Sequence, residues 1–169
     1  MLARRGNIGL ACLADVSGLN TPPSGHTFGF MLGPRINAGG RIGSSDLGVR
    51  LLSTQSGDEA LGLAAALDEL NIRRREIEQE IRAHAMDMAA EQADKPVVLV
   101  GYPDWHEGVI GIVAGRLREV LCKPACVVSL GADGAGKGSG RSIPGFRLGS
   151  AVIAASQAGV IAAGGGHDM

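Results

Sequence analysis

The sequence is poor in aromatic residues and cysteine, and it contains no long hydrophobic run. Aromatic side chains make up 3% of its 169 residues, which leaves the core to aliphatic and alanine side chains. Three cysteines, without framework spacing, exclude a disulfide scaffold and favour a reducing compartment. No apolar segment is long enough to cross a bilayer. These absences predict a cytoplasmic protein that contacts no membrane.

The sequence also lacks a large excess of positive or negative side chains. The formal net charge of −1 excludes a global basic field for nucleic acid. Residues 1–55 nevertheless carry five Arg against two Asp, whereas residues 56–96 carry ten acidic and five basic side chains. Any contact with nucleic acid is therefore expected to be local, made by arginines in segments rich in the 27 glycines.

A buried strand followed by a helix is predicted at residues 96–121. The β-branched run at 96–101 indicates the strand, and apolar residues from Val109 onward recur at helical spacing. His106 and Gly108 then lie where the helix begins, and the free N–H groups of a helix start suit an anion. An ordinary strand–helix unit with a solvated histidine explains the same spacing. Gly111 and Gly115, one turn apart, would allow close backbone approach.

Residues 33–43 place two Arg and one Asn among four Gly and a Pro, which predicts an irregular loop. Arg35 and Arg41 would grip phosphate there through their guanidinium forks. The alternative is a glycine-rich turn whose arginines cap helix ends. Residues 1–20 are expected to form a short helix, and residues 44–46 to cap another one.

The longest helical pattern runs from Ser56 to about Gln92. Its apolar residues alternate spacings of four and three, as in a heptad seam interrupted at Arg74 and His84. At 1.5 Å per residue the helix would span roughly 50 Å, which is longer than a small domain is wide. We therefore expect it to connect two bodies.

A hairpin and a further helix are predicted toward the end of the chain. Residues 125–130 resemble a second buried strand, with a turn at Gly134 and a returning strand at 137–143. Arg141 and Ser142 would then lie on a ligand-facing edge. Residues 148–157 favour an alanine-rich helix, and the glycine-rich end at 164–169 suggests a domain that is cut short.

Four motifs, in this order, resemble the RecJ family of single-strand-specific 5′→3′ DNA exonucleases in the DHH phosphoesterase superfamily. They are PRINAGGRI at 34–42, WHEGVIGIVAGRL at 105–117, GSGRSI at 138–143 and GGGH at 164–167. Residues 67–75, LDELNIRRR, also resemble the interdomain helix of that family.

The resemblance implies an α/β fold, with a DHHA1-type mixed sheet and flanking helices preceded by a long connecting helix and the tail of a DHH domain. The expected boundaries are 1–55 for the tail, 56–92 for the helix and 93–169 for a truncated DHHA1 domain. The parent enzyme would act on single-stranded DNA in repair and recombination, using Mn²⁺ or Mg²⁺ held by its DHH domain. This chain has no Asp-His-His triplet and only scattered histidines, so we assign it no metal ligand and expect it to be inactive alone.

The resemblance also implies which residues bind nucleic acid or phosphate. The substrate-side residues would be Arg141, Ser142, Gly165, Gly166 and His167. Residues lining the groove would be Arg35, Asn37, Arg41, His106 and Gly108. His167 is the one candidate for a catalytic role.

Three alternatives remain at this point. The chain resembles, less closely, the nanoRNA and cyclic-dinucleotide phosphodiesterases of the same superfamily, which also carry a Gly-Gly-Gly-His segment. It is also similar to the non-catalytic tRNA-binding DHHA1 module of alanyl-tRNA synthetases. The third alternative is an α/β domain without a ligand.

Overall fold

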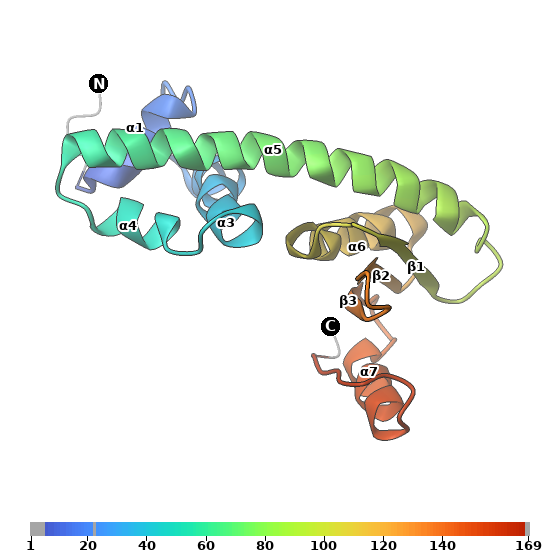
Figure 1. The fold of residues 1–169 in the computed structure, drawn as a ribbon. Coiled ribbons are helices and arrows are strands. Elements are labelled where there is room, and N and C mark those ends of the chain that lie inside the picture. Colours follow the sequence, from blue (N-terminus) through green and yellow to red (C-terminus); the bar gives the residue numbers. More distant parts are fainter. Residues whose placement is uncertain (1–5, 22, 168–169) are drawn as a thin grey trace. The chain divides into compact units, whose positions relative to one another are not determined.

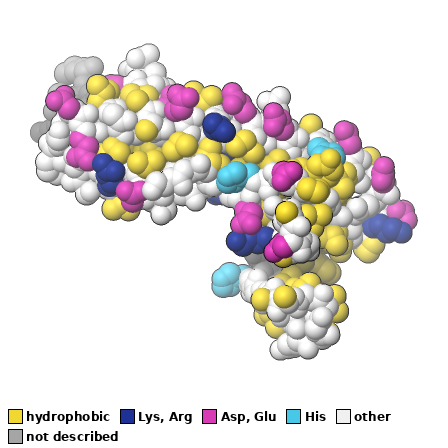
Figure 2. Space-filling model, in the orientation of Figure 1, with side chains coloured by type: hydrophobic (Ala, Val, Ile, Leu, Met, Phe, Trp, Pro, Cys, Tyr) yellow, Lys and Arg dark blue, Asp and Glu magenta, His cyan; other side chains and the backbone are white. Residues whose placement is uncertain are grey.

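The computed structural model describes residues 6–21 and 23–167 (Figure 1). The chain divides into two compact units, Met1–Glu76 and Ile77–Met169. The boundary falls inside one long helix, α5 (Gly57–Ala90), which therefore contributes residues to both units. This helix confirms the one predicted from Ser56 to about Gln92. Figure 2 shows acidic side chains distributed along it, as the acidic excess of residues 56–96 predicts.

Unit 1 is built from helices. They are α1 (Ile8–Val16), α2 (Gly25–Thr27), the π-helical turn η1 (Phe28–Leu32), α3 (Gly33–Ile42), α4 (Leu47–Ser53) and the first part of α5. α1 confirms the short helix predicted within residues 1–20, and the Asn7 side chain caps it by accepting a hydrogen bond from the Leu10 N–H at 2.9 Å. The core of the unit consists of Leu13, Ala14, Leu32, Leu51, Leu63, Ala64 and Leu67.

The prediction of an irregular loop at residues 33–43 is wrong, because α3 occupies almost all of that segment. Pro34 lies in the first turn of α3, directly after the π-helical turn η1. Gly39 is buried, and a Cβ there would lie 3.2 Å from Leu67 Cδ2. The glycines that lower helix propensity thus allow close packing on α5, and this packing outweighs the propensity.

Close backbone approach also fixes α1 against α4. A Cβ on Gly9 would overlap the carbonyl oxygen of Leu51, so only glycine fits this crossing. α4 begins where residues 44–46 predicted a cap. The Asp46 side chain, however, accepts a hydrogen bond from the Ser44 hydroxyl and caps no backbone N–H.

Unit 2 is an α/β arrangement that follows the last part of α5. It contains β1 (Val98–Pro103), α6 (Glu107–Leu121), β2 (Ala125–Leu130), β3 (Gly136–Arg141) and α7 (Leu148–Gln157). The sheet order is β1-β2-β3, with β1 and β2 parallel and β2 and β3 antiparallel. Gly134 has φ +79 in the turn before β3, which confirms the predicted hairpin. α6 begins at Glu107, two residues before the predicted start.

One face of this sheet packs on α6 (Figure 1). Val98, Val100 and Val127 are at most 2% exposed. On α6, Val109 and Val113 are fully buried, as the helical spacing predicts. Among the described residues, no helix is both long and apolar enough to span a bilayer.

Candidate functional site

Arg141 and Ser139 lie side by side on β3, next to α6. The Arg141 Nη1 donates hydrogen bonds to Ser139 Oγ at 3.2 Å and to the Gly140 carbonyl at 2.7 Å. A Cβ on Gly111 of α6 would lie 3.0 Å from Ser139 Oγ and 3.2 Å from Arg141 Nη2. Gly111 therefore provides the close approach that the sequence predicts. Gly115 has nothing within 4 Å of the place of its Cβ.

The charge of Arg141 is uncompensated within the described part of the chain. Its side chain is exposed, and its hydrogen bonds go to a hydroxyl and a carbonyl rather than to a carboxylate. The other cation of β3, Lys137, contacts Glu107 Oε2 at 2.7 Å. An anion that binds a guanidinium without a carboxylate partner does not have to displace an existing ion pair. Arg141 is therefore well suited to bind phosphate.

Ser142, whose hydroxyl was predicted to act with Arg141, instead forms a hydrogen bond within the loop that follows β3. Its Oγ donates to the Phe146 carbonyl at 2.5 Å, which stabilises the turn before α7. The hydroxyl beside Arg141 belongs to Ser139, which our sequence reasoning missed. The signal was the alternation of glycine with Lys137, Ser139 and Arg141, because a period of two puts these three side chains on one face.

His106 and Gly108 lie at the start of α6, as predicted, but they bond to each other. The Gly108 N–H donates to His106 Nδ1 at 3.1 Å, so this N–H is not free for an anion. Glu107 adds a negative charge to the same turn. The neutral His106 ring then carries its proton on Nε2, and the residue is exposed. The helix start is therefore less suited to an anion than its spacing predicts, although His106 retains one donor.

The segment that ends with His167 packs on the first turn of α7. A Cβ on Gly149 would lie 2.6 Å from the carbonyl oxygen of His167 and 3.0 Å from that of Gly166. Gly166 has φ +155, and Gly165 is exposed. Gly149 thus places the glycine-rich segment, a role that sequence reasoning missed. Within the described residues, no hydrogen bond or ion pair joins the His167 side chain to Arg141.

Of the three groove residues predicted in unit 1, the helical form of α3 places Arg35 on a different face from Asn37 and Arg41. Arg35 Nε contacts Asp68 Oδ1 at 2.7 Å, and its Nη1 donates to the Met31 carbonyl at 2.8 Å. The Arg35 side chain is only 13% exposed. Asn37 and Arg41 are exposed and lie one turn apart on α3. The fold therefore directs the charge of Arg35 inward and leaves the other two at the surface.

Side chains that could ligate a metal are scattered in this fold. Across residues 6–21 and 23–167, no group of three or more His, Cys, Asp or Glu side chains could hold an ion. The residues described here do not fit a divalent metal centre.

Comparisons with known proteins agree with this architecture. Residues 94–169 match the DHHA1 domain family. The chain is similar to the single-stranded-DNA-specific exonuclease RecJ of Escherichia coli, at 38% identity over 148 residues, covering 83% of this chain and 26% of that protein. It is 34% identical over 175 residues to RecJ of Haemophilus influenzae, covering 99% of this chain and 30% of the relative.

Solved structures give the same result. The crystal structure of RecJ from Thermus thermophilus in complex with Mn²⁺ superposes with a TM-score of 0.82 at 30% identity, covering 95% of this chain and 23% of that one. A structure of exonuclease RecJ bound to manganese gives a TM-score of 0.73, covering 89% of this chain and 37% of that one. The chain spans about a quarter of the curated relatives it matches, at 25% for RecJ of Salmonella typhimurium. These matches confirm the resemblance and the predicted α/β fold class.

Proposed function

We propose that this chain belongs to the RecJ family, to whose members it is similar, and that it is part of a single-stranded-DNA-specific 5′→3′ exonuclease and binds the backbone of the nucleic acid. The observation that carries this proposal is the uncompensated guanidinium of Arg141 beside the Ser139 hydroxyl. Both groups donate hydrogen bonds to phosphate oxygens without reading the base sequence.

The remaining predicted residues support this role to different degrees. His106 offers an exposed Nε2–H, and Asn37 and Arg41 present polar groups on one face of α3. Gly165 and Gly166 expose backbone that a phosphate can approach closely. A catalytic role for His167 stays a prediction, as do the domain boundaries at residues 55 and 92.

In the proposed parent enzyme, Mn²⁺ or Mg²⁺ would supply the charge stabilisation that phosphodiester hydrolysis needs. The residues described here do not fit such an ion, so we assign them binding and positioning of the strand alone. The parent would work in the cytoplasm, in DNA repair and recombination.

The proposal is tested by fluorescence anisotropy of a 5′-phosphorylated single-stranded oligonucleotide titrated with this chain. Salt-sensitive binding is expected, weakened about tenfold by Arg141→Ala because one charge-assisted contact is lost. Arg82→Ala, which removes an exposed cation of the same unit, is the matched control and should leave the affinity nearly unchanged. No cleavage is expected on addition of Mn²⁺. Absence of binding at low salt would contradict the proposal.

A further inference from the structure

The outer side of β1 is a strand edge in unit 2. Within the described residues the sheet has the order β1-β2-β3, so β1 pairs with one neighbouring strand. The Val98 N–H donates to the Pro124 carbonyl at 2.9 Å, on the side of β2. Because successive backbone groups of a strand alternate in direction, the N–H and C=O groups of Leu99 and Gly101 point to the outer side. A row of such groups is a template for pairing with a further strand.

The sequence of β1 favours such pairing. Residues 97–102 read VVLVGY, a segment with three β-branched residues, no charge and no proline. Segments of six or seven residues with high β-propensity and low charge are those that stack as strands between molecules when an edge is open. The Leu99 side chain is 59% exposed, so a second molecule has access to it. The edge of β1 therefore needs protection.

Gln92 provides this protection with one side chain, two residues beyond the end of α5. Its amide makes both hydrogen bonds that a neighbouring strand would make at Leu99. The Leu99 N–H donates to Gln92 Oε1 at 3.0 Å, and Gln92 Nε2 donates to the Leu99 carbonyl at 2.8 Å. A side-chain amide carries an acceptor and a donor, as a peptide group does. It therefore takes the place of a partner strand without extending the sheet.

The turn that carries Gln92 is itself fixed to unit 2. Lys123 Nζ donates to the carbonyl oxygens of Ala93 and Lys95, at 2.6 and 2.9 Å. The Lys95 N–H donates to the Gln92 carbonyl at 3.0 Å. Lys123 follows α6, which packs on the sheet, so the turn and β1 are held by the same body. Gln92 is thus held in position against the edge.

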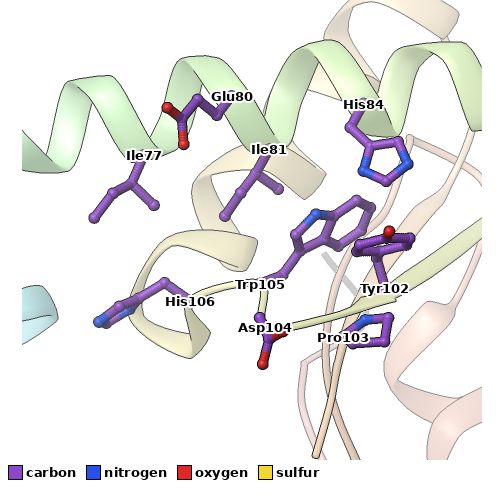
Figure 3. A pocket seen from close by; sticks show the side chains of 9 residues that line it. All are labelled: Ile77, Glu80, Ile81, His84, Tyr102, Pro103, Asp104, Trp105 and His106. Atoms are coloured by element: carbon purple, nitrogen blue, oxygen red, sulfur yellow. The ribbon is translucent and has the colours of Figure 1, made fainter.

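The opposite end of β1 is closed in other ways. Pro103 has no N–H, so it offers no donor to a further strand. Asp104 has φ +63, and this left-handed residue follows the end of the strand. The Tyr102 ring meets His84 of α5 edge-on, with ring centroids 4.3 Å apart (Figure 3). Pairing at the outer edge must therefore begin at Leu99 or Gly101, and Gln92 occupies the first of these.

We propose that Gln92 keeps β1 from pairing with the β1 strand of a second copy of this chain. A second copy suits this edge because it carries the same uncharged segment, and two identical edges pair about a two-fold axis. Without the amide, the Leu99 N–H and C=O groups are free to bond to a second β1 edge, which presents the complementary groups. This role is independent of the proposed binding of nucleic acid, which depends on Arg141.

The test compares Gln92→Ala with the parent chain by sedimentation velocity at a series of protein concentrations. We expect the variant to self-associate at least about tenfold more tightly, because two hydrogen bonds no longer block the edge. Gln79→Ala, which removes an exposed glutamine of α5 in the same unit, is the matched control and should behave as the parent. Adding Leu99→Lys to Gln92→Ala should reverse the association, because a charge on an edge strand opposes pairing.

Hydrogen exchange of the Leu99 N–H, followed by NMR, separates this role from a purely structural one. In Gln92→Ala the exchange should be faster than in the parent at low protein concentration, and it should slow again as the variant associates. Association that leaves this exchange unchanged, or that Leu99→Lys does not reverse, would overturn the proposal, because another surface would be responsible. Equal association of the parent, Gln79→Ala and Gln92→Ala would overturn it as well.

Circular dichroism verifies the fold of each variant. Lys123→Met, which releases the turn that carries Gln92, should also increase self-association, and it decides the matter if Gln92→Ala does not fold.

Discussion

Arg35 in unit 1 and Arg141 in unit 2 have the same side chain and the same predicted role, yet the fold gives them opposite states. Arg35 is 13% exposed and paired with Asp68, whereas Arg141 is exposed and bonded to neutral oxygens. An arginine whose charge is already neutralised gains little from a phosphate, because binding must first disrupt the existing pair. Residue type and motif therefore indicate which arginines are candidates for a phosphate contact. Whether a candidate can bind phosphate depends on its partner within the fold.

The same contrast holds for the acidic residues. Asp68 and Glu78 are partners of arginines, whereas Glu80 and Asp104 have no partner within the described residues. Arg35 and Asp68 join α3 to α5 in unit 1, and Arg116 and Glu78 join α6 to α5 in unit 2. Arg141, Glu80 and Asp104 of unit 2 are exposed and have no oppositely charged partner within the described residues. The following predictions test that division.

The largest effect is expected from Gly9→Ala, which tests whether the two units are stabilised separately. The added Cβ would overlap the Leu51 carbonyl oxygen, so α1 and α4 must separate. We expect unit 1 to lose about 3 kcal/mol of stability, as severe overpacking does. Chemical denaturation followed by circular dichroism measures this loss. The emission of Trp105, in unit 2, should keep its midpoint, and a matching shift would show that the units unfold together.

Arg35→Ala tests the structural role of the half-buried pair. Removing the guanidinium leaves Asp68 without its partner, and we expect a loss of roughly 1–3 kcal/mol in the free energy of unfolding. Arg141→Ala, at an exposed side chain, should change it by less than about 0.5 kcal/mol. Urea denaturation of the two variants measures the difference. Equal effects on stability would remove the distinction between the two arginines.

Gly111→Ala and Gly115→Ala form a matched pair on one helix. Both replace a helical glycine and should gain up to about 1 kcal/mol of helix propensity. At Gly111 the new Cβ crowds Ser139 and Arg141, so oligonucleotide affinity should fall several-fold, by about 1 kcal/mol. At Gly115 the space is open, and affinity should not change. Anisotropy titrations of both variants give the comparison, and identical affinities would contradict the assigned site.

The smallest effect is expected at the surface of unit 1, for Thr54→Val. The Thr54 hydroxyl donates to Glu59 at 2.6 Å and, with Arg50, lowers the pKa of that carboxyl. Because the folded pKa lies below the unfolded one, the stabilisation is present at higher pH and is lost as pH falls through the folded pKa. The variant should raise the pKa of Glu59 in an NMR titration. Its stability deficit should disappear once the carboxyl is protonated, and a deficit independent of pH would exclude this linkage.

Much of unit 2 was predictable from the sequence because its strands and helices carry strong local patterns. The β-branched runs of β1 and β2, the turn at Gly134 and the apolar stripe of α6 each specify an element without help from distant residues. The long helix α5 was predictable for the same reason, since its periodicity persists over 34 residues.

The parts that could not be predicted depend on contacts between distant segments. α3 is helical because Gly39 packs on Leu67, far along the chain, and propensity alone favours a loop there. Arg35 is neutralised by Asp68, which no local spacing reveals. Ile77 and Ile81 of α5 line one cleft with Trp105 of the loop that follows β1, an arrangement that no local pattern indicates. The position of Ser139 could have been predicted, because the alternation of side chains along a strand places it beside Arg141.

The salt dependence of oligonucleotide binding tests the central contrast most directly. Each phosphate neutralised on a single strand contributes about 0.7 to the slope of log affinity against log salt. We predict that Arg141→Ala reduces this slope by about 0.7, and that Arg35→Ala, measured where circular dichroism shows it folded, leaves the slope unchanged. An unchanged slope in Arg141→Ala, or an equal reduction in Arg35→Ala, would contradict the account.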